Sequence, residues 1–280
     1  MEKVAVVTGC SSGIGYELAL RLNYSGWKVF ATARHIETME PLREAGCHTY
    51  QLDVGVPEEI DRTVDKFIGE CGRIDMLINN AGYGLIAPSA EISTDEMQRQ
   101  FQVNVFGMMA MIQKTVPVMK LQKSGLIINI GSISGIAPTP FSGAYCASKA
   151  AIHAWSDVLR MELKPFGIHV ITVQPGGIST NFGNNCEKNL RNLLKPDSWY
   201  SSIESFIYLR ARTSQEKATP VAVFAEKLIS EMLQPDPPPV IRIGKRSITL
   251  PLMKRCVPAK LLDKIMMKKY GLNSLNGSSN

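Results

Sequence analysis

The first fifteen residues constrain the fold more than any other stretch. Residues 4–7, Val-Ala-Val-Val, form a short apolar run suited to a buried parallel strand. A glycine-rich segment follows at residues 8–15, and residues 16–22 then have the composition of a helix. A strand, a glycine-rich turn and a helix in this order place a pyrophosphate at the N-terminus of the helix. The spacing is Gly-x-x-x-Gly-x-Gly rather than Gly-x-Gly-x-x-Gly, and a purely structural turn is the alternative.

Strand-like and helix-like segments alternate through the first two-thirds of the chain. After residues 4–7, β-branched or aliphatic runs occupy residues 28–33, 49–52, 76–79, 126–130, 169–173 and 240–243. Helical patterns separate them at residues 36–45, 58–71, 95–119 and 144–165. This alternation predicts an α/β fold, with a parallel sheet of about seven strands and helices on both faces. A chain of 280 residues suits one large domain of this kind, so we expect residues 1–280 to form a single domain.

A second motif carries chemistry. Tyr145 and Lys149 are four residues apart, about one helical turn, so both side chains should project from the same face. An ammonium at that place favours the ionised phenol, and we expect it to lower the tyrosine pKa from its usual value near ~10. Such a phenol can give or take a proton near neutral pH. Tyr-x-x-x-Lys alone is weak evidence, because many helices contain it by chance.

These motifs together resemble the short-chain dehydrogenase/reductases in their single-domain form. The resemblance rests on residues 8–15, on Asn-Asn-Ala-Gly at residues 79–82, and on Asn104, Ser132, Tyr145 with Lys149, and Pro175-Gly176. These elements occur in the order and spacing of that family, from residue 3 to about residue 180. The resemblance implies a doubly wound Rossmann fold and hydride transfer between a nicotinamide and a carbonyl or alcohol carbon.

The resemblance also assigns catalytic roles. Tyr145 is the expected acid in reduction and base in oxidation, and Lys149 lowers its pKa and bonds the nicotinamide ribose. Ser132 should bond the carbonyl oxygen as negative charge develops there. Asn104 matches the position that holds a water in a proton relay, although a lone helical asparagine is often structural.

The second strand indicates which nicotinamide cofactor is used. An acidic residue at its end would repel a 2′-phosphate, but this chain has Ala33 and Arg34 there, and Ser12 could add a hydroxyl. NADP(H) is therefore expected. For Asn79 and Asn80, a structural role in tying strands together is at least as well supported as contact with the cofactor. Thr8 is suited to bracing the glycine-rich turn. The cofactor contacts implied by the resemblance are Gly9, Ser11, Ser12, Gly13, Ile14, Gly15, Arg34, Asp53, Val54, Asn80, Ala81, Gly82, Tyr145, Lys149, Pro175, Gly176, Ile178 and Thr180.

Two later segments depart from the alternating pattern. Residues 177–219 match the place of a substrate lid, and their apolar content suggests an oily substrate or simply packing of the lid. Residues 241–280 contain nine Lys or Arg against one acid, whereas the whole chain carries a net charge of +6. Within a basic extension at residues 244–280, residues 258–270 predict an amphipathic helix. Residues 244–272 could contact an anionic membrane, or the tail could lie beside the substrate cleft.

Several classes of protein fit poorly. The six cysteines have no close-spaced pair, and no metal site is expected. Basic charge confined to one terminal segment argues against nucleic-acid binding. The sequence shows neither a signal peptide nor an apolar run of membrane-spanning length, so we expect an intracellular, cytoplasmic protein that could be peripheral on a membrane. A homo-oligomer is compatible with the family.

The sequence is compatible with three functions. The leading hypothesis is an NADPH-dependent reductase of a lipid-like ketone, since Arg34, residues 80–84 and the tail resemble the branch of 1-acyl-dihydroxyacetone-phosphate reductases. The alternative is oxidation or reduction of a steroid or retinoid, as in the neighbouring hydroxysteroid 17β-dehydrogenase and retinol dehydrogenase branches. A second alternative is a non-enzymatic module that binds NADP(H) and a membrane.

Overall fold

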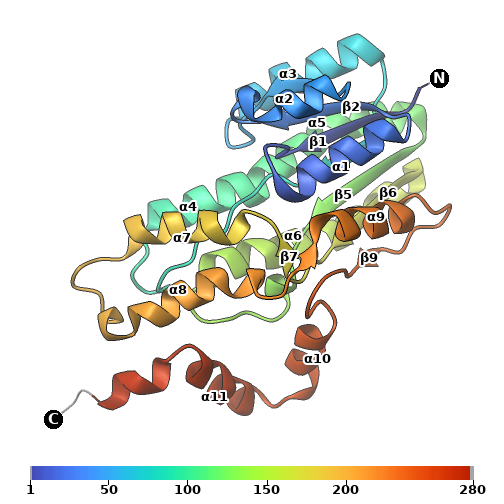
Figure 1. Cartoon of the computed structure of the whole chain (residues 1–280). Coiled ribbons are helices and arrows are strands. Elements are labelled where there is room, and N and C mark those ends of the chain that lie inside the picture. Colours follow the sequence, from blue (N-terminus) through green and yellow to red (C-terminus); the bar gives the residue numbers. More distant parts are fainter. Residues whose placement is uncertain (1, 278–280) are drawn as a thin grey trace.

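A computed structural model describes residues 2–277 and places a seven-stranded sheet at the centre of the molecule (Figure 1). The strand order is β3-β2-β1-β4-β5-β6-β9, and every neighbouring pair is parallel. The strands are β1 Val4–Thr8, β2 Lys28–Ala33, β3 His48–Gln51, β4 Met76–Asn79, β5 Gly125–Ile130, β6 Ile168–Val173 and β9 Val240–Ile241. The predicted parallel sheet is therefore confirmed, and its last strand is shorter than the predicted 240–243.

Helices cover both faces of this sheet. One core cluster joins the sheet to α1 Gly13–Tyr24, α2 Glu40–Glu44 and α9 Val221–Met232, and the other joins it to α3 Pro57–Cys71, α5 Gly107–Gln122 and α6 Gly143–Leu163. Buried Leu18 and Phe224 represent the first cluster, and Phe67 and Ile152 the second. The doubly wound Rossmann arrangement that the sequence predicts is thus the observed one.

Two predicted helices change helix type along their length. The pattern at residues 36–45 forms a 3-10 turn, Ile36–Met39, followed by α2. The pattern at residues 95–119 begins as α4 Thr94–Phe101, passes through a π-helical turn, Gln102–Phe106, and continues as α5. A Cβ on Gly107 would come 2.2 Å from the Val54 carbonyl oxygen, so the chain passes this loop with no room for a side chain. The predicted helical segment is therefore confirmed as one uninterrupted helical stretch, and the π-helical turn within it is a feature that hydrophobic periodicity does not report.

The predicted lid contains two helices, α7 Phe182–Leu193 and α8 Glu204–Arg212. It leaves the domain through β7 Ile178–Ser179 and returns through β8 Thr219–Pro220, which pair with each other. The tail forms α10 Thr249–Cys256 and α11 Ala259–Lys269, which lie beyond α8 at the bottom of Figure 1. Tyr270 is only 2% exposed and belongs to an apolar cluster with the lid residues Ile203 and Ile207. The tail therefore packs on the lid.

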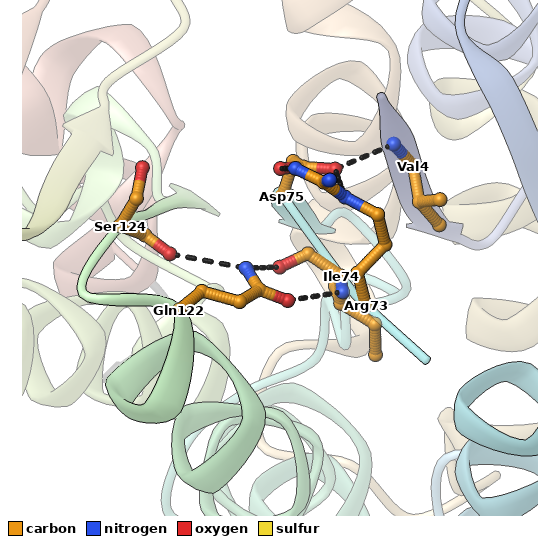
Figure 2. Close-up of polar contacts among 6 residues, drawn as sticks. All are labelled: Val4, Arg73, Ile74, Asp75, Gln122 and Ser124. Atoms are coloured by element: carbon orange, nitrogen blue, oxygen red, sulfur yellow. Dashed lines mark hydrogen bonds and ion pairs between the residues drawn. The ribbon is translucent and has the colours of Figure 1, made fainter. Parts of the chain in front are cut away.

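A polar cluster closes the amino-terminal edge of the sheet, at the start of β4 (Figure 2). The Gln122 side chain accepts from the Ile74 amide at 2.9 Å and donates to the Ile74 carbonyl at 2.9 Å. Asp75 accepts from the Val4 amide at 2.8 Å and from the Arg73 guanidinium. Burial alone would raise the pKa of Asp75, but these hydrogen bonds hold it below its usual value. The cluster joins β1, β4 and the end of α5 at the edge farthest from the carboxyl ends of the strands.

We predict that Gln122→Ala destabilises the fold. Ile74 is fully buried, and the substitution leaves its amide and carbonyl without the Gln122 partner, which should cost about 2 kcal/mol in the free energy of unfolding. Urea unfolding measures this loss. The matched control is Gln98→Ala on α4, where the side chain is exposed and the expected change is within about 0.5 kcal/mol. Equal unfolding midpoints for the two variants would contradict the stabilising role of the Gln122 hydrogen bonds to Ile74.

Candidate active site at the carboxyl ends of the strands

A cavity of about 1030 Å³ lies at the carboxyl ends of the strands, between the sheet, the lid and the tail. Its volume is at the upper end of the range for ligand pockets, roughly 300–1,000 Å³. With two exceptions the predicted catalytic and cofactor residues line it, although they come from loops far apart in the chain. The exceptions are Gly15 and Asn104.

The glycine-rich turn is fixed against the end of β4. The Thr8 hydroxyl accepts from the amides of Asn80 and Ala81, each at 3.0 Å. The Asn80 side chain donates to the carbonyls of Thr8 and Gly9 at 2.9 and 3.0 Å. Gly9 has φ +73°, and a Cβ there would lie 2.7 Å from the Ala81 Cα. Thr8 and Asn80 thus brace the turn, the structural role that the sequence left open for them.

Gly15 has a packing role. A Cβ on this residue would lie 2.5 Å from the Gly9 carbonyl oxygen and 2.4 Å from the side-chain nitrogen of Asn80. The first turn of α1 therefore rests directly on the glycine-rich loop. Gly15 shapes the loop without lining the cavity, and its contact with a cofactor stays a prediction.

The start of α1 fits a pyrophosphate. The first turn of α1 contains no acidic residue, and the Ser12 side chain at its N-cap makes no capping hydrogen bond. Ser11, Ser12, Gly13 and Ile14 all line the cavity. A helix N-terminus with uncapped amides carries partial positive charge and donates readily to phosphate oxygens. The residues present therefore suit a dinucleotide, as the sequence predicts.

Arg34 stands at the same end of the cavity. It follows β2 directly, its side chain is exposed, and within residues 2–277 it forms no ion pair. The carboxylate of Asp53 in the neighbouring loop accepts from the Gly55 amide at 2.8 Å. The nearest acidic residue along the chain, Glu37, lies 3.6 Å from His35 instead. An exposed guanidinium that forms no ion pair is suited to a phosphate.

Tyr145 lies on the first turn of α6, with 8% of its surface exposed. Its ring packs against Phe182 at the start of α7, with centroids 5.5 Å apart. Burial raises the pKa of Tyr145, while contact with Ser132 works in the opposite direction. Tyr145 and Ser132 thus meet at the cavity wall, as predicted.

The expected effect of Lys149 on the tyrosine is not what the structure shows. Lys149 shares a helix face with Tyr145, but its ammonium lies 5.9 Å from the phenol ring centroid and donates to the Ile130 carbonyl at 2.7 Å. Burial also lowers the pKa of Lys149 itself to about 8. The predicted lowering of the Tyr145 pKa by Lys149 is therefore wrong for this structure, because burial dominates both groups.

The His153 side chain bonds the backbone of Ser132 and so helps to hold it in place. The Ser132 amide donates to the His153 Nε2 at 3.3 Å, and the Ser132 hydroxyl accepts from the Ser134 amide at 3.1 Å. Burial, and then the charge of Lys149, lower the pKa of His153 to about 4, so the imidazole is neutral and can accept. None of the sequence motifs described above includes His153. Its position one helical turn after Lys149 is the signal that could have linked it to the site.

Asn104 is buried beneath the cavity wall, within the π-helical turn. Its side chain accepts from the Tyr83 amide at 3.0 Å and donates to the Tyr83 carbonyl at 3.0 Å and to the Ser148 hydroxyl at 3.1 Å. These bonds fix the loop at Tyr83, which lines the cavity. The relay of a proton through a water at Asn104 stays a prediction.

Sequence reasoning missed several residues that line the cavity. Phe182, Cys186 and Arg210 come from the lid, and Met266, Lys269 and Tyr270 come from the tail. The apolar composition of the lid was a usable signal. A tail beside the substrate cleft was one of the two alternatives that the sequence left open, and no local pattern decided between them.

Comparisons with known proteins agree with this geometry. The family model described as short chain dehydrogenase matches residues 3–191. The uncharacterized oxidoreductase YbbO of Escherichia coli is 35% identical, over 95% of this chain and 94% of its own length. The NADPH-dependent 1-acyldihydroxyacetone phosphate reductase of Saccharomyces cerevisiae is 32% identical, over 99% of this chain and 94% of its own. A short-chain dehydrogenase structure from Streptomyces avermitilis superposes with a TM-score of 0.80 at 26% identity, over 100% of this chain and 99% of that one. The chain belongs to the short-chain dehydrogenase family.

Proposed function

We propose that this protein is an NADPH-dependent reductase of a hydrophobic, lipid-like ketone. The observation that carries the proposal is one continuous cavity with three parts. A phosphate cradle and Arg34 form one end, Ser132, Tyr145 and Lys149 the middle, and the lid and tail the other end.

NADP(H) is the cofactor that this site takes. Arg34 occupies the place where an acidic residue would exclude a 2′-phosphate, and Ser11 and Ser12 line the same part of the cavity. The yeast relative described above is named as NADPH-dependent, which supports the same choice. The bound nicotinamide would supply the hydride, and the protein would position the ketone and deliver one proton.

The raised pKa of Tyr145 suits a proton donor. A buried phenol stays protonated until negative charge develops on the substrate oxygen, and it can then transfer its proton. Ser132 would donate a hydrogen bond to the same oxygen. Lys149, with its pKa near 8, keeps a positive charge beside the phenol at neutral pH and would bond the nicotinamide ribose.

The surroundings of the ketone favour an amphiphilic substrate. Phe182, Leu193, Met266 and Tyr270 give the outer cavity an apolar wall. An acyl chain would bury well against such side chains, each of which gains roughly 1.5–3 kcal/mol on full burial. The likeness to a 1-acyldihydroxyacetone phosphate reductase makes an acylated ketone phosphate the first substrate to test.

Tyr145→Phe should abolish turnover while leaving cofactor binding intact, because only the transferable proton is removed. NADPH oxidation with 1-acyldihydroxyacetone phosphate, a 17-ketosteroid, retinal and a short aliphatic ketone measures the first effect, and titration of NADPH fluorescence the second. We expect a loss of roughly 10²–10⁴-fold or more, the usual contribution of a positioned acid. Turnover of the steroid or retinal alone would redirect the proposal to those substrates. NADPH binding without wild-type turnover of any ketone would contradict it.

Arg34→Leu tests the choice of cofactor. Removing a charge-assisted contact with phosphate should weaken NADPH binding by about 10-fold or more, since such contacts contribute roughly 1.5–3 kcal/mol. Binding of NADH, which has no 2′-phosphate, should change little. Arg62→Leu on α3 is a control, because that arginine does not line the cavity. A wild-type preference for NADH would contradict the role of Arg34.

The tail is suited to an anionic membrane surface, with the protein in a peripheral position. Within residues 2–277 no helix has the length and apolarity needed to span a bilayer. The inner face of α11 buries Leu262, but Leu261 and Ile265 stay 51% and 41% exposed beside Lys260 and Lys264. Leu252 on α10 and Ile248, the residue just before that helix, are exposed as well. Exposed apolar side chains interleaved with lysines are typical of helices that lie on anionic lipid.

Replacing Lys260, Lys264 and Lys268 together with glutamine should release the protein from vesicles that contain phosphatidylserine. Each basic residue near such a surface contributes about 1 kcal/mol, so the triple variant should bind roughly 100-fold more weakly in a sedimentation assay. The triple control Lys66→Gln, Lys123→Gln and Lys227→Gln removes the same charge from exposed sites elsewhere and should bind like wild type. Equal losses in both variants would contradict the proposal. The proposal would also be contradicted if the wild-type protein did not bind vesicles and instead dimerised through the exposed face of α10 and α11.

A further inference from the structure

Arg210 is a buried cation in the wall of the cavity. It belongs to α8 in the lid, and only 8% of the residue is exposed. Its Nε donates to the Thr139 hydroxyl at 2.7 Å, and its Nη2 donates to the Ser142 hydroxyl at 3.1 Å. Both partners are neutral. Among residues 2–277 no carboxylate lies within salt-bridge distance of this guanidinium.

A guanidinium buried in this way is unusual. Burying a charge is costly, and folded proteins normally compensate with a paired opposite charge. The two hydroxyls satisfy hydrogen bonds but carry no charge. The first turn of α6, where Ser142 is the N-cap, contains no acidic residue. The acidic residues that line the cavity are Asp53, Glu96 and Glu216, and none of them pairs with Arg210. The compensating charge is missing from the described chain.

The position of this cation relates it to the reacting group. Ser142, which holds the guanidinium, comes three residues before Tyr145 on the same helix. Burial is the main influence that raises the pKa of Tyr145 and of Cys186, and the charge of Arg210 opposes it at both residues. The guanidinium therefore lies close enough to act electrostatically on the phenol. Because Ser142 holds the guanidinium at the start of α6 and Tyr145 lies on the first turn of that helix, a ligand group that meets Arg210 would lie on the same side of the cavity as a carbonyl that meets Tyr145.

We propose that Arg210 binds an anionic group, a phosphate or a carboxylate, next to the carbonyl that this enzyme reduces. The inference rests on the proposed reductase function and narrows its substrate class to ketones with an anion close to the carbonyl. A guanidinium has five N–H donors in a fixed fork, so those not used by Thr139 and Ser142 can bond an oxyanion. Steroids and retinoids lack such a group and would leave the cation unpaired.

A purely structural role for Arg210 would lead to a different experimental result. Arg210 could serve only to clasp α8 to the loop that contains Thr139 and Ser142. In that case, removing the two hydroxyls should have the same effect as removing the guanidinium. If Arg210 recognises an anion, removing the two hydroxyls should weaken anion binding less than removing the guanidinium charge does.

Calorimetric titration with dodecyl phosphate and with dodecanol separates these roles. Saturating NADP⁺ is present, so that the phosphate cradle at α1 is occupied. We expect wild type to bind dodecyl phosphate at least 10-fold more tightly than dodecanol. Arg210→Met should remove that preference while leaving the dodecanol affinity unchanged, and Arg210→Lys should keep part of it. The double variant Thr139→Val and Ser142→Ala should retain the preference.

Two results would overturn the inference. One is a wild type that binds both amphiphiles equally, and the other is a double variant that loses the preference as fully as Arg210→Met. Circular dichroism and the NADPH dissociation constant verify that each variant is folded. If Arg210→Met does not fold, the wild-type preference and the partial retention in Arg210→Lys decide the matter.

Kinetics separate failure of this inference from failure of the proposed function. With a ketone phosphate, Arg210→Met should raise KM by 10-fold or more, whereas KM for the phosphate-free ketone should not change. Wild-type turnover of both ketones with equal KM would refute the role of Arg210 and leave the reductase intact. A phosphate preference in binding without turnover of either ketone would refute the reductase function and leave the anion site.

Discussion

The whole site depends on how the carboxyl ends of β1 and β4 are joined. These strands are neighbours at the centre of the sheet, and the strand order runs outward from them in both directions. Such a reversal opens a crevice at the carboxyl ends of the strands. Here Thr8 and Asn80 bond across it, and a side chain at Gly9 would collide with Ala81. The tight joint sets where α1 begins, and therefore where a phosphate can bind.

Burial shapes the chemistry of the middle of the cavity. It raises the pKa of the Tyr145 phenol and lowers the pKa of the Lys149 ammonium to about 8, so both groups are driven toward their neutral forms. A phenol that holds its proton is ready to act as an acid in reduction. The neutral His153 behind Ser132 belongs to the same pattern, because its pKa near 4 leaves Nε2 free to accept from the Ser132 amide.

The sequence predicted the parts of this molecule that depend on local pattern. The strand-turn-helix at residues 4–22 and the pairing of Tyr145 with Lys149 on one helix face follow from composition and spacing, and the structure has both. The π-helical turn at Asn104 arises where the chain passes Val54 without room for a side chain, which periodicity does not encode. Burial raises the pKa of Tyr145, and one of the residues packed against its ring is Phe182, more than thirty residues away in the chain. Such long-range contacts are invisible to local reasoning.

The tail illustrates how one segment can serve two of the alternatives that the sequence posed. Tyr270 is buried against the lid, which places the end of α11 at the cavity, while Lys260 and Lys264 on the same helix remain exposed. The membrane contact proposed above would therefore use a different face from the one packed at the cleft, and the two would not compete. Lys269 lines the cavity at its outer part and Arg210 lies deeper, beside the helix that carries Tyr145. Positive charge thus extends from the tail to the reacting group, and an anionic amphiphile is the ligand that such a field would attract.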